Sequence, residues 1–479
     1  MNLLIFNQKN EHIFLLLISV LLFFYSSLGL MKEKMYFSQD ELLLNYWTNV
    51  SGFPPLNLFS TKHDDRPTGW ALIYLLNRLN KNNYHIQLIS ILCLHLTNSF
   101  LLYILLKKRN INKVLSACGA IIFTHNFPAN KSAFYIGAVF DITCCTFLLL
   151  SLIYYSNKYI YKTSLSLIFY HISVRSKEMS IFLPFYLLCS EFITKNTTTK
   201  NFAKYISPFL IILLLCIASY ATRDFFQINS FTDGNFYQLN FSFNTIGSNF
   251  IHYVRQIIPD NNFILSVIIL LYFIGLIQLN RNLIISIVGF VLFLLPVLAY
   301  KYHRADYFLY VPNIFFSMAI IYSINSKSRD CLLKLNFFSK LNLFTLNTSS
   351  FARMPIYLII ISLFFQNLSP NSSLNKYLSN EIKTREPLAI LNTYIKNNFS
   401  YIKPETKFYL KGIPNISENE TDTWHIMGYV LGLITDNKFM VVFTDNVFSN
   451  LEEKYLLDSA PKIFLEYQYG NYVILHEDM

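Results

Sequence analysis

Charged residues are scarce in this sequence, and acidic residues are the scarcest. Only 14% of the 479 residues are charged, whereas 53% are hydrophobic and 17% are aromatic. This balance argues against a typical soluble protein and is typical of a polytopic membrane protein. The 39 basic residues outnumber the 28 acidic residues, which gives a net charge of +11. Such an excess commonly lies in the cytoplasmic loops of membrane proteins, so we expect no nucleic-acid partner.

Familiar chemical motifs are also missing. The seven cysteines show neither zinc-ligand spacing nor a disulfide framework. Six of them fall in apolar segments, so we expect them to pack in the core. The chain has no P-loop, no Gly-x-Ser-x-Gly elbow, no His-Glu-x-x-His helix and no internal repeat. These absences argue against the nucleotide-binding, hydrolase and zinc-protease classes that those motifs mark.

Long hydrophobic runs fill most of the first 370 residues. A membrane-spanning helix needs about 20 mostly apolar residues. The clear candidates are 13–31, 85–106, 205–222, 263–279, 283–300, 307–324 and 355–369. The weaker or interrupted candidates are 114–127, 138–156, 164–174 and 179–194. Together they predict an all-α polytopic membrane bundle of about eleven transmembrane helices. A cleaved signal peptide is the alternative for 13–31.

Basic residues gather in alternate loops, which predicts the topology. The basic loops, nearly free of acid, are 107–113, 157–162, 195–204, 280–282 and 325–354. The loops of mixed charge are 32–84, 125–137, 175–178, 223–262 and 301–306, followed by the tail. The positive-inside rule places the basic loops and the N-terminus in the cytoplasm. The mixed loops and the C-terminus are then outside.

The tail has a different pattern from the bundle. KFYLKGIP and FMVVF are typical of strands, HIMGYVLGLI is typical of a helix, and KIFLEYQYGNYVILH predicts a hairpin with Tyr-Gly at its turn. We therefore expect a transmembrane domain over 1–369, with a long first outer loop over 32–84. A small α/β domain over 370–479 is expected on the extracytoplasmic side.

Ionisable residues gather on the predicted outer side. Such groups cost about 2.5–3.5 kcal/mol each at membrane depth, so they usually have partners or a function. Any one of them can be an ordinary solvated loop residue, but the set recurs where helices enter or leave the membrane. We therefore expect a polar site there. The set comprises Asp40, Glu41, Asp64, Asp65, Arg66, Asp141, Lys177, Glu178, His303, Arg304 and Asp306.

The stretch STKHDDRPTGWALIYLLNRL places Arg66 at the level of the lipid headgroups. Pro67 can open a helix at its first turn. The run 70–79 is apolar but too short to span, so we expect an interfacial helix anchored by Trp70. An arginine there suits a lipid-linked phosphate, because its planar fork pairs with two phosphate oxygens. The simpler alternative is an N-cap by Asp65 and a headgroup contact by Arg66.

Two further polar clusters interrupt apolar runs. SVRSKEMS contains Lys177 and Glu178, and YHRADYF contains His303, Arg304 and Asp306. A histidine can titrate near neutral pH. The simpler alternative for the first cluster is a turn that meets lipid phosphates. For the second it is a surface pair of Arg304 with Asp306, which would contribute little stability.

Four stretches together resemble one family. They are YFSQDELLLNYW, RPTGWALIYLLNRLNKNNYHIQLISILCLHLTNSFLL, SKEMSIFLPFYLL and RADYFLYVP. They are similar to the Phe-x-x-Asp-Asp…Asn, Arg-Pro-Leu with Leu-His-x-x-Asn, Ser-Lys-Glu-Thr…Leu-Pro and Arg-Tyr-x-Tyr-Leu-Pro motifs of polytopic membrane glycosyltransferases of the GT-C fold. The resemblance covers roughly residues 13–320. The branch looks like the bacterial relatives of protein O-mannosyltransferases and of the TPR-bearing transmembrane O-mannosyltransferases.

The second outer loop departs from the family pattern. The family often shows His-Pro…Glu in that loop. THNFPANKSAFYIGAVFD keeps Pro128 and an acid, Asp141, but Ser132 stands where the Glu would fall. This departure leaves the role of a second-loop acid open. No TPR array follows the bundle.

The resemblance implies transfer of a sugar from a polyprenyl-phosphate donor to an acceptor hydroxyl on the outer face, with inversion. Asp40 matches the acid of the family's first outer loop and would act as general base. Further candidate acids are Glu41, Asp64 and Asp141. The leaving phosphate needs positive charge, which Arg66, Lys177 and Arg304 could supply. The supporting residues are Glu178, His303 and Asn45.

The resemblance predicts no metal, although carboxylates at Asp40 and Asp64 leave a divalent cation as an alternative. The expected partners are the lipid-linked sugar donor, a protein, glycan or lipid acceptor, and membrane lipids. The expected location is the bacterial inner or cell membrane.

Other functions stay open from the sequence. An O-antigen ligase or polysaccharide polymerase favours a late outer loop with Arg and His, and 223–262 holds Arg223, His252 and Arg255. A transporter of lipid-linked sugars often has inverted repeats and midplane charges, and neither pattern is visible here. A receptor-like protein that binds a partner through its tail would leave the outer charge cluster without a purpose.

Overall fold

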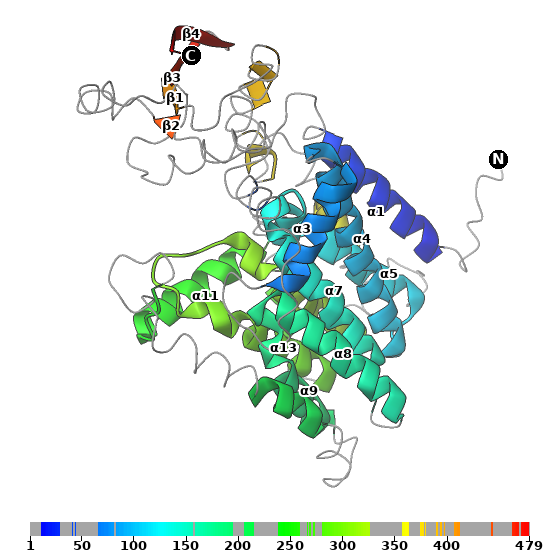
Figure 1. Ribbon diagram of the computed structural model, residues 1–479. Coiled ribbons are helices and arrows are strands. Elements are labelled where there is room, and N and C mark those ends of the chain that lie inside the picture. Colours follow the sequence, from blue (N-terminus) through cyan, green and yellow to red (C-terminus); the bar gives the residue numbers. More distant parts are fainter. Residues whose placement is uncertain are drawn as a thin grey trace, which may run out of the picture. The chain divides into compact units, whose positions relative to one another are not determined.

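The computed structural model of the chain contains a helical bundle and a small β-sheet (Figure 1). Its contacts divide the chain into two units, 1–27 with 55–69 and 90–375, and 28–54 with 70–89 and 376–479. The structure describes residues 11–28, 41, 44, 66–80, 83–156, 159–194, 206–214, 238–258, 266, 268–269, 272–273, 280–325, 357–363, 374–377, 379, 389–390, 393–394, 397, 407–411, 442–443, 462–468 and 471–478.

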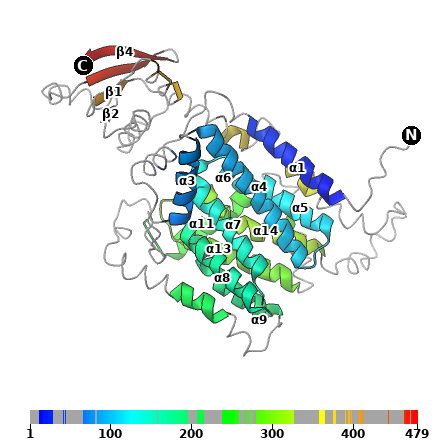
Figure 2. The ribbon, with the colours of Figure 1, turned by 45° about the vertical axis from the view of Figure 1, so that its right-hand side comes forward.

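The helices of the bundle follow the apolar runs of the sequence. In chain order they are α1 (Glu11–Ser27), α3 (Pro67–Asn80), α4 (Tyr84–Lys108), α5 (Lys113–His125), α6 (Phe127–Ala133), α7 (Val139–Tyr154), α8 (Ile160–Ser176), α9 (Leu183–Thr194), α11 (Phe243–Ile257), α13 (Arg281–Leu298) and α14 (Pro312–Asn325). In the described residues, short 3₁₀ turns also lie between helices: η2 (Ile136–Ala138), η3 (Glu178–Phe182) and η5 (Asp306–Leu309). Helix α7 packs along α8, and α13 packs along α14 (Figure 2).

Some helices of this bundle are long enough to cross a membrane. Among the described residues, three helical segments are long and apolar enough to cross a membrane, Tyr84–Lys108, Ile136–Tyr154 and Arg281–Leu298. Shorter apolar helices cover Glu11–Tyr25, Lys113–His125 and Pro312–Ile324. The chain is therefore an integral membrane protein, as its composition predicted. The count of about eleven spans and the orientation of the termini stay predictions.

Prolines and one asparagine set the helix boundaries. Pro67 opens α3, as predicted, and Pro312 opens α14. The predicted span 307–324 therefore starts later than expected, after a 3₁₀ turn. Pro296 lies inside α13, two residues before its end. Proline has no N–H, so it cannot donate the helical hydrogen bond to the preceding turn. Asn126 ends α5 and caps α6, where its side chain accepts from the Phe127 amide at 3.1 Å.

A buried polar belt ties the bundle helices together. It consists of His95, Asn98, Thr124, Thr146 and Tyr310. The His95 ring shares a hydrogen bond with the Tyr310 hydroxyl at 2.7 Å and one with the Thr124 carbonyl at 3.3 Å. Asn98 donates to the Tyr310 hydroxyl at 3.2 Å and accepts from Thr146 at 2.7 Å. Hydrogen bonds of this kind hold membrane helices together where no hydrophobic force between helices exists.

The sheet has four strands in the order β2-β1-β3-β4. The strands are β1 (Lys407–Lys411), β2 (Val442–Phe443), β3 (Lys462–Gln468) and β4 (Asn471–Asp478). β1 is parallel to β2 and β3, whereas β3 and β4 are antiparallel. The predicted strands and the predicted hairpin are therefore confirmed. Parallel neighbours need crossover connections, which suits an α/β unit. The helix predicted over 425–434 lies outside the described residues.

Candidate functional site

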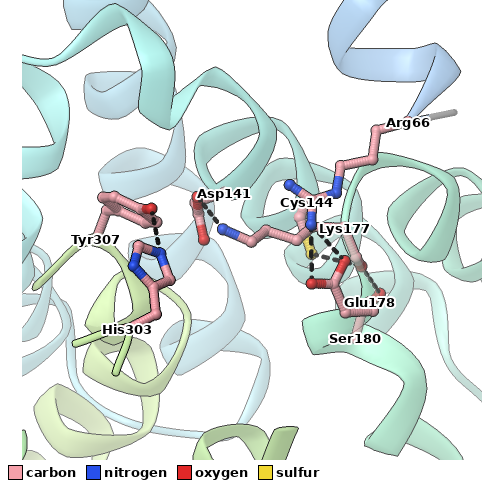
Figure 3. A network of polar contacts seen from close by, with 8 residues as sticks. All are labelled: Arg66, Asp141, Cys144, Lys177, Glu178, Ser180, His303 and Tyr307. Carbon is pink, nitrogen blue, oxygen red and sulfur yellow. Dashed lines mark hydrogen bonds and ion pairs between the residues drawn. The ribbon is translucent and has the colours of Figure 1, made fainter. Parts of the chain in front are cut away.

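Lys177 is placed by a sharp break between two helical segments. Helix α8 ends at Ser176, Lys177 is extended with φ −161° and ψ 145°, and η3 begins at Glu178. The Lys177 amide donates to the Ser173 carbonyl at 3.1 Å, which closes α8. The Lys177 carbonyl accepts from Ser180 at 3.4 Å. These bonds fix the backbone and send the side chain toward α7 (Figure 3).

The Lys177 ammonium forms a buried ion pair with Asp141. The Nζ–Oδ2 distance is 2.5 Å, and the side chains are only 3% and 2% exposed. Asp141 belongs to the first turn of α7, near the start of the predicted span 138–156. Its second oxygen, Oδ1, is buried and has no hydrogen-bond partner in the described part of the chain. Burial lowers the pKa of Lys177, and the Asp141 carboxylate opposes that shift.

Two aromatic rings complete the surroundings of Lys177. Its Nζ lies 4.8 Å from the centre of the Tyr307 ring and 4.7 Å from that of Phe308. Both residues belong to η5. An ammonium this close to two ring faces is attracted by their quadrupoles. The ammonium has three N–H donors and gives one to Asp141, so it retains capacity for an anionic ligand.

Arg66 is held beside this pair by Glu178. The Arg66 Nη2 lies 2.9 and 3.0 Å from the two oxygens of Glu178. The guanidinium lies 5.6 Å from the centre of the Phe140 ring. Gly69, in the first turn of α3, lets this ring approach, because any Cβ there would overlap it. Figure 3 shows both ion pairs, which bring Arg66, Glu178, Lys177 and Asp141 into one network.

The predicted cluster at 303–306 divides between different neighbours. His303 Nε2 shares a hydrogen bond with the Tyr307 hydroxyl at 2.9 Å, which attaches it to the aromatic wall of Lys177. Arg304 donates to Asn249 of α11 at 2.7 Å, so its guanidinium is held by that helix. Asp306 pairs with Lys131 of α6 at 2.7 Å. The suggested surface pair of Arg304 with Asp306 is thus wrong.

Several predicted site residues lie outside the described part of the chain. They are the proposed base Asp40, the supporting Asn45, and Asp64 with its neighbour Asp65. Glu41 is described and fully buried in the second unit. Ser132, in the loop 125–137 that was predicted to be outer, is also buried, and its hydroxyl donates to the Pro128 carbonyl at 2.7 Å.

Some residues of the network were missed at the sequence level. Tyr307 and Phe308 line Lys177, Lys131 pairs with Asp306, and Asn249 holds Arg304. The RADYFLYVP motif contained the two rings, but 17% of the chain is aromatic, so they did not stand out. In the residues that the structure covers, no group of three His, Cys, Asp or Glu side chains converges as a metal site would require.

Comparison with known proteins identifies the fold. No protein-family model matches the sequence, and no curated protein matches it. The structure is similar to crystal structures of ArnT from Cupriavidus metallidurans. The apo form has a TM-score of 0.56 and 9% identity, over 96% of this chain and 93% of ArnT. The form bound to undecaprenyl phosphate has a TM-score of 0.53 and 10% identity, over 95% and 92%. The fold is thus the GT-C fold of polytopic membrane glycosyltransferases, as the motifs predicted.

Proposed function

We propose that this chain is a membrane glycosyltransferase. It transfers a sugar from a polyprenyl-phosphate-linked donor to an acceptor hydroxyl at the outer face of the membrane, with inversion at the anomeric carbon. The observation that carries the proposal is the network in which Arg66 and Lys177 lie side by side, each held by an acid. The shared fold supports it, because one ArnT structure holds undecaprenyl phosphate.

The two cations suit the leaving group of this reaction. The lipid phosphate gains negative charge as the anomeric C–O bond breaks, and fixed positive charge stabilises the departing phosphate more than the ground-state donor. Lys177 supplies a point charge held by Asp141, and Arg66 supplies a planar fork held by Glu178. Arg304 completes the proposed set of cations, with its guanidinium set by Asn249 and by Ser248 at 2.8 Å.

The general base in this proposal is Asp40, from the resemblance of YFSQDELLLNYW to the family motif. Asp141 is less suited to that role. Its Oδ2 is bonded to the Lys177 ammonium, and that positive charge disfavours uptake of the acceptor's proton by the carboxylate. Asp141 therefore positions Lys177, while Glu41 and Asp64 stay the alternatives for the base. A divalent cation between Asp40 and Asp64 is the alternative to metal-free transfer.

The proposed orientation follows the charge of the loops. The N-terminus and the basic loops lie in the cytoplasm, and the small sheet unit lies on the extracytoplasmic side. Of the known branches, the motifs favour the bacterial relatives of protein O-mannosyltransferases.

The test is complementation of a deletion strain of the native host. The variants are Asp40→Asn, Lys177→Met and the control Lys162→Met, at matched membrane levels. Lys162 is a fair control, since its ammonium also lies near two tyrosine rings, 4.8 Å from Tyr159 and 5.9 Å from Tyr161, but in the first turn of α8, at the end opposite Lys177. Surface glycans, glycoproteins and polyprenyl-phosphate sugars are then profiled by mass spectrometry.

We expect Asp40→Asn and Lys177→Met to lose one sugar from the surface and to accumulate its lipid-linked donor, while Lys162→Met behaves like wild type. Normal products from Asp40→Asn would move the base to another acid. A deletion strain that accumulates a completed lipid-linked glycan, rather than a single lipid-linked sugar, would indicate a ligase. A deletion that changes no glycan would refute sugar transfer.

A further inference from the structure

We infer that Tyr307 is a positioning residue: the face of its ring, together with that of Phe308, holds the Lys177 ammonium in place to bind the donor phosphate. This inference rests on the proposed function. It adds two aromatic rings to the proposed phosphate site, because the charged residues alone would not fix the position of the ammonium.

The first support is the geometry around the ammonium. Tyr307 and Phe308 meet edge to face, with ring centres 4.8 Å apart and an interplanar angle of 70°. The Lys177 Nζ lies 4.8 and 4.7 Å from the two centres, so it sits in the angle between the rings. Asp141 takes one hydrogen bond from the same nitrogen. Two ring faces and one carboxylate therefore restrict the ammonium, which leaves its other N–H groups for a ligand.

The second support is that the Tyr307 ring is itself fixed. Its hydroxyl shares the 2.9 Å hydrogen bond with His303. Its face stacks on Tyr135 of the second outer loop, with centres 6.0 Å apart and an angle of 27°. His303 in turn packs edge to face on Phe308, 5.1 Å between centres. The ring that Lys177 meets thus has few alternative orientations. Figure 3 shows His303 and Tyr307 next to the Lys177–Asp141 pair.

The length of the lysine side chain is the physical reason why the two rings are needed. A lysine has several rotatable bonds and loses considerable rotamer entropy when it is held in one place. Asp141 alone would hold one N–H and leave the ammonium free to rotate about that hydrogen bond. A cation–π contact is strongest in a desolvated site, and Lys177 is only 3% exposed. The rings therefore keep the ammonium charged and oriented without competing for its hydrogen bonds.

The test replaces Tyr307 with phenylalanines that keep the shape of the ring while the electrostatic potential of the ring face becomes less negative. Phe, 4-fluoro-, 3,5-difluoro- and 3,4,5-trifluorophenylalanine are introduced in the full-length protein. Binding of farnesyl phosphate is measured in detergent, with farnesol as the probe that lacks the phosphate. The same series at Tyr159 is the control, because its ring lies the same 4.8 Å from a lysine, Lys162, outside the network.

We expect Tyr307→Phe to bind within about threefold of wild type, because the ring face is retained. Each added fluorine should weaken binding further, to about tenfold or more for the trifluoro ring, as loss of a desolvated cation–π contact requires. The Tyr159 series should stay flat. A residue that only fills space would give no such gradient, since the rings have nearly the same size.

Two results would overturn the inference without touching the proposed function. One is a flat series at position 307 while Lys177→Met abolishes binding. The other is a full loss already with Tyr307→Phe, which would assign the role to the hydroxyl instead of the ring face. If folded wild-type protein binds farnesyl phosphate no better than farnesol, the phosphate site itself, and with it the proposed function, fails.

Discussion

The buried pair of Asp141 and Lys177 makes a quantitative prediction about stability. The single variants Asp141→Leu and Lys177→Met each remove one charge and keep a side chain of similar shape. Each leaves the other charge buried without its partner, at side-chain exposures of only 3% for Lys177 and 2% for Asp141. The double variant D141L/K177M removes both charges together.

The magnitude follows from the cost of an unpaired buried charge. Breaking a buried ion pair from one side typically costs about 3–5 kcal/mol. Replacing both partners by apolar groups of similar size is often neutral or stabilising. We therefore expect each single variant to lose about 3–5 kcal/mol of unfolding free energy. The double variant should recover most of that loss. The 2.5 Å contact places the pair among directly coupled residues, where additivity fails.

The assay is reversible unfolding of the purified protein in mixed micelles, with the four chains of the cycle measured side by side. A coupling energy is obtained from the wild type, the two single variants and the double variant. Additive losses, with the double variant as unstable as the sum of the singles, would refute the account. They would mean that water or lipid headgroups already solvate each charge separately.

Three smaller predictions follow from the same contacts. Farnesyl phosphate binding should be lost as pH rises through the pKa of Lys177, because burial lowers that pKa and only the protonated ammonium binds. The midpoint of a pH titration should therefore lie below the pKa of an ordinary lysine, and a higher midpoint would contradict this. Glu178→Gln should cost under about 1 kcal/mol of unfolding free energy, because its pair with Arg66 is partly exposed; thermal denaturation measures it. Thr146→Val removes its bond to Asn98 and should cost about 0.6 kcal/mol in the micelle assay, whereas no loss would argue against the polar belt.

Much of the bundle was predictable because bilayer thickness sets the length of an apolar run. The runs 85–106, 114–127 and 283–300 correspond closely to α4, α5 and α13. The break inside 307–324 was not predicted, since a 3₁₀ turn and an α-helix look alike in hydrophobicity. Pro312 was the available signal, as it marks where α14 begins.

The site was predictable as a set of charges, but its pairing was not. Asp306 and Arg304 are neighbours in sequence, yet the chain changes from an extended Ala305 into η5, which sends the two side chains to α6 and α11. Lys177 pairs with Asp141, 36 positions away, instead of the adjacent Glu178. Such choices depend on how helices pack, which local sequence does not encode.

The polar belt also has a consequence for how the chain is made. His95 and Tyr310 are separated by 215 positions. At about 5–20 residues per second, a ribosome needs roughly 10–40 s to synthesise the intervening chain. During that interval α4 resides near or within the membrane with its histidine and Asn98 lacking their tyrosine partner. Provisional partners, in the insertion machinery or in earlier helices, must shelter these groups until Tyr310 emerges. Assembly of the bundle is therefore completed only when Tyr310 has been synthesised and pairs with His95 and Asn98 of α4.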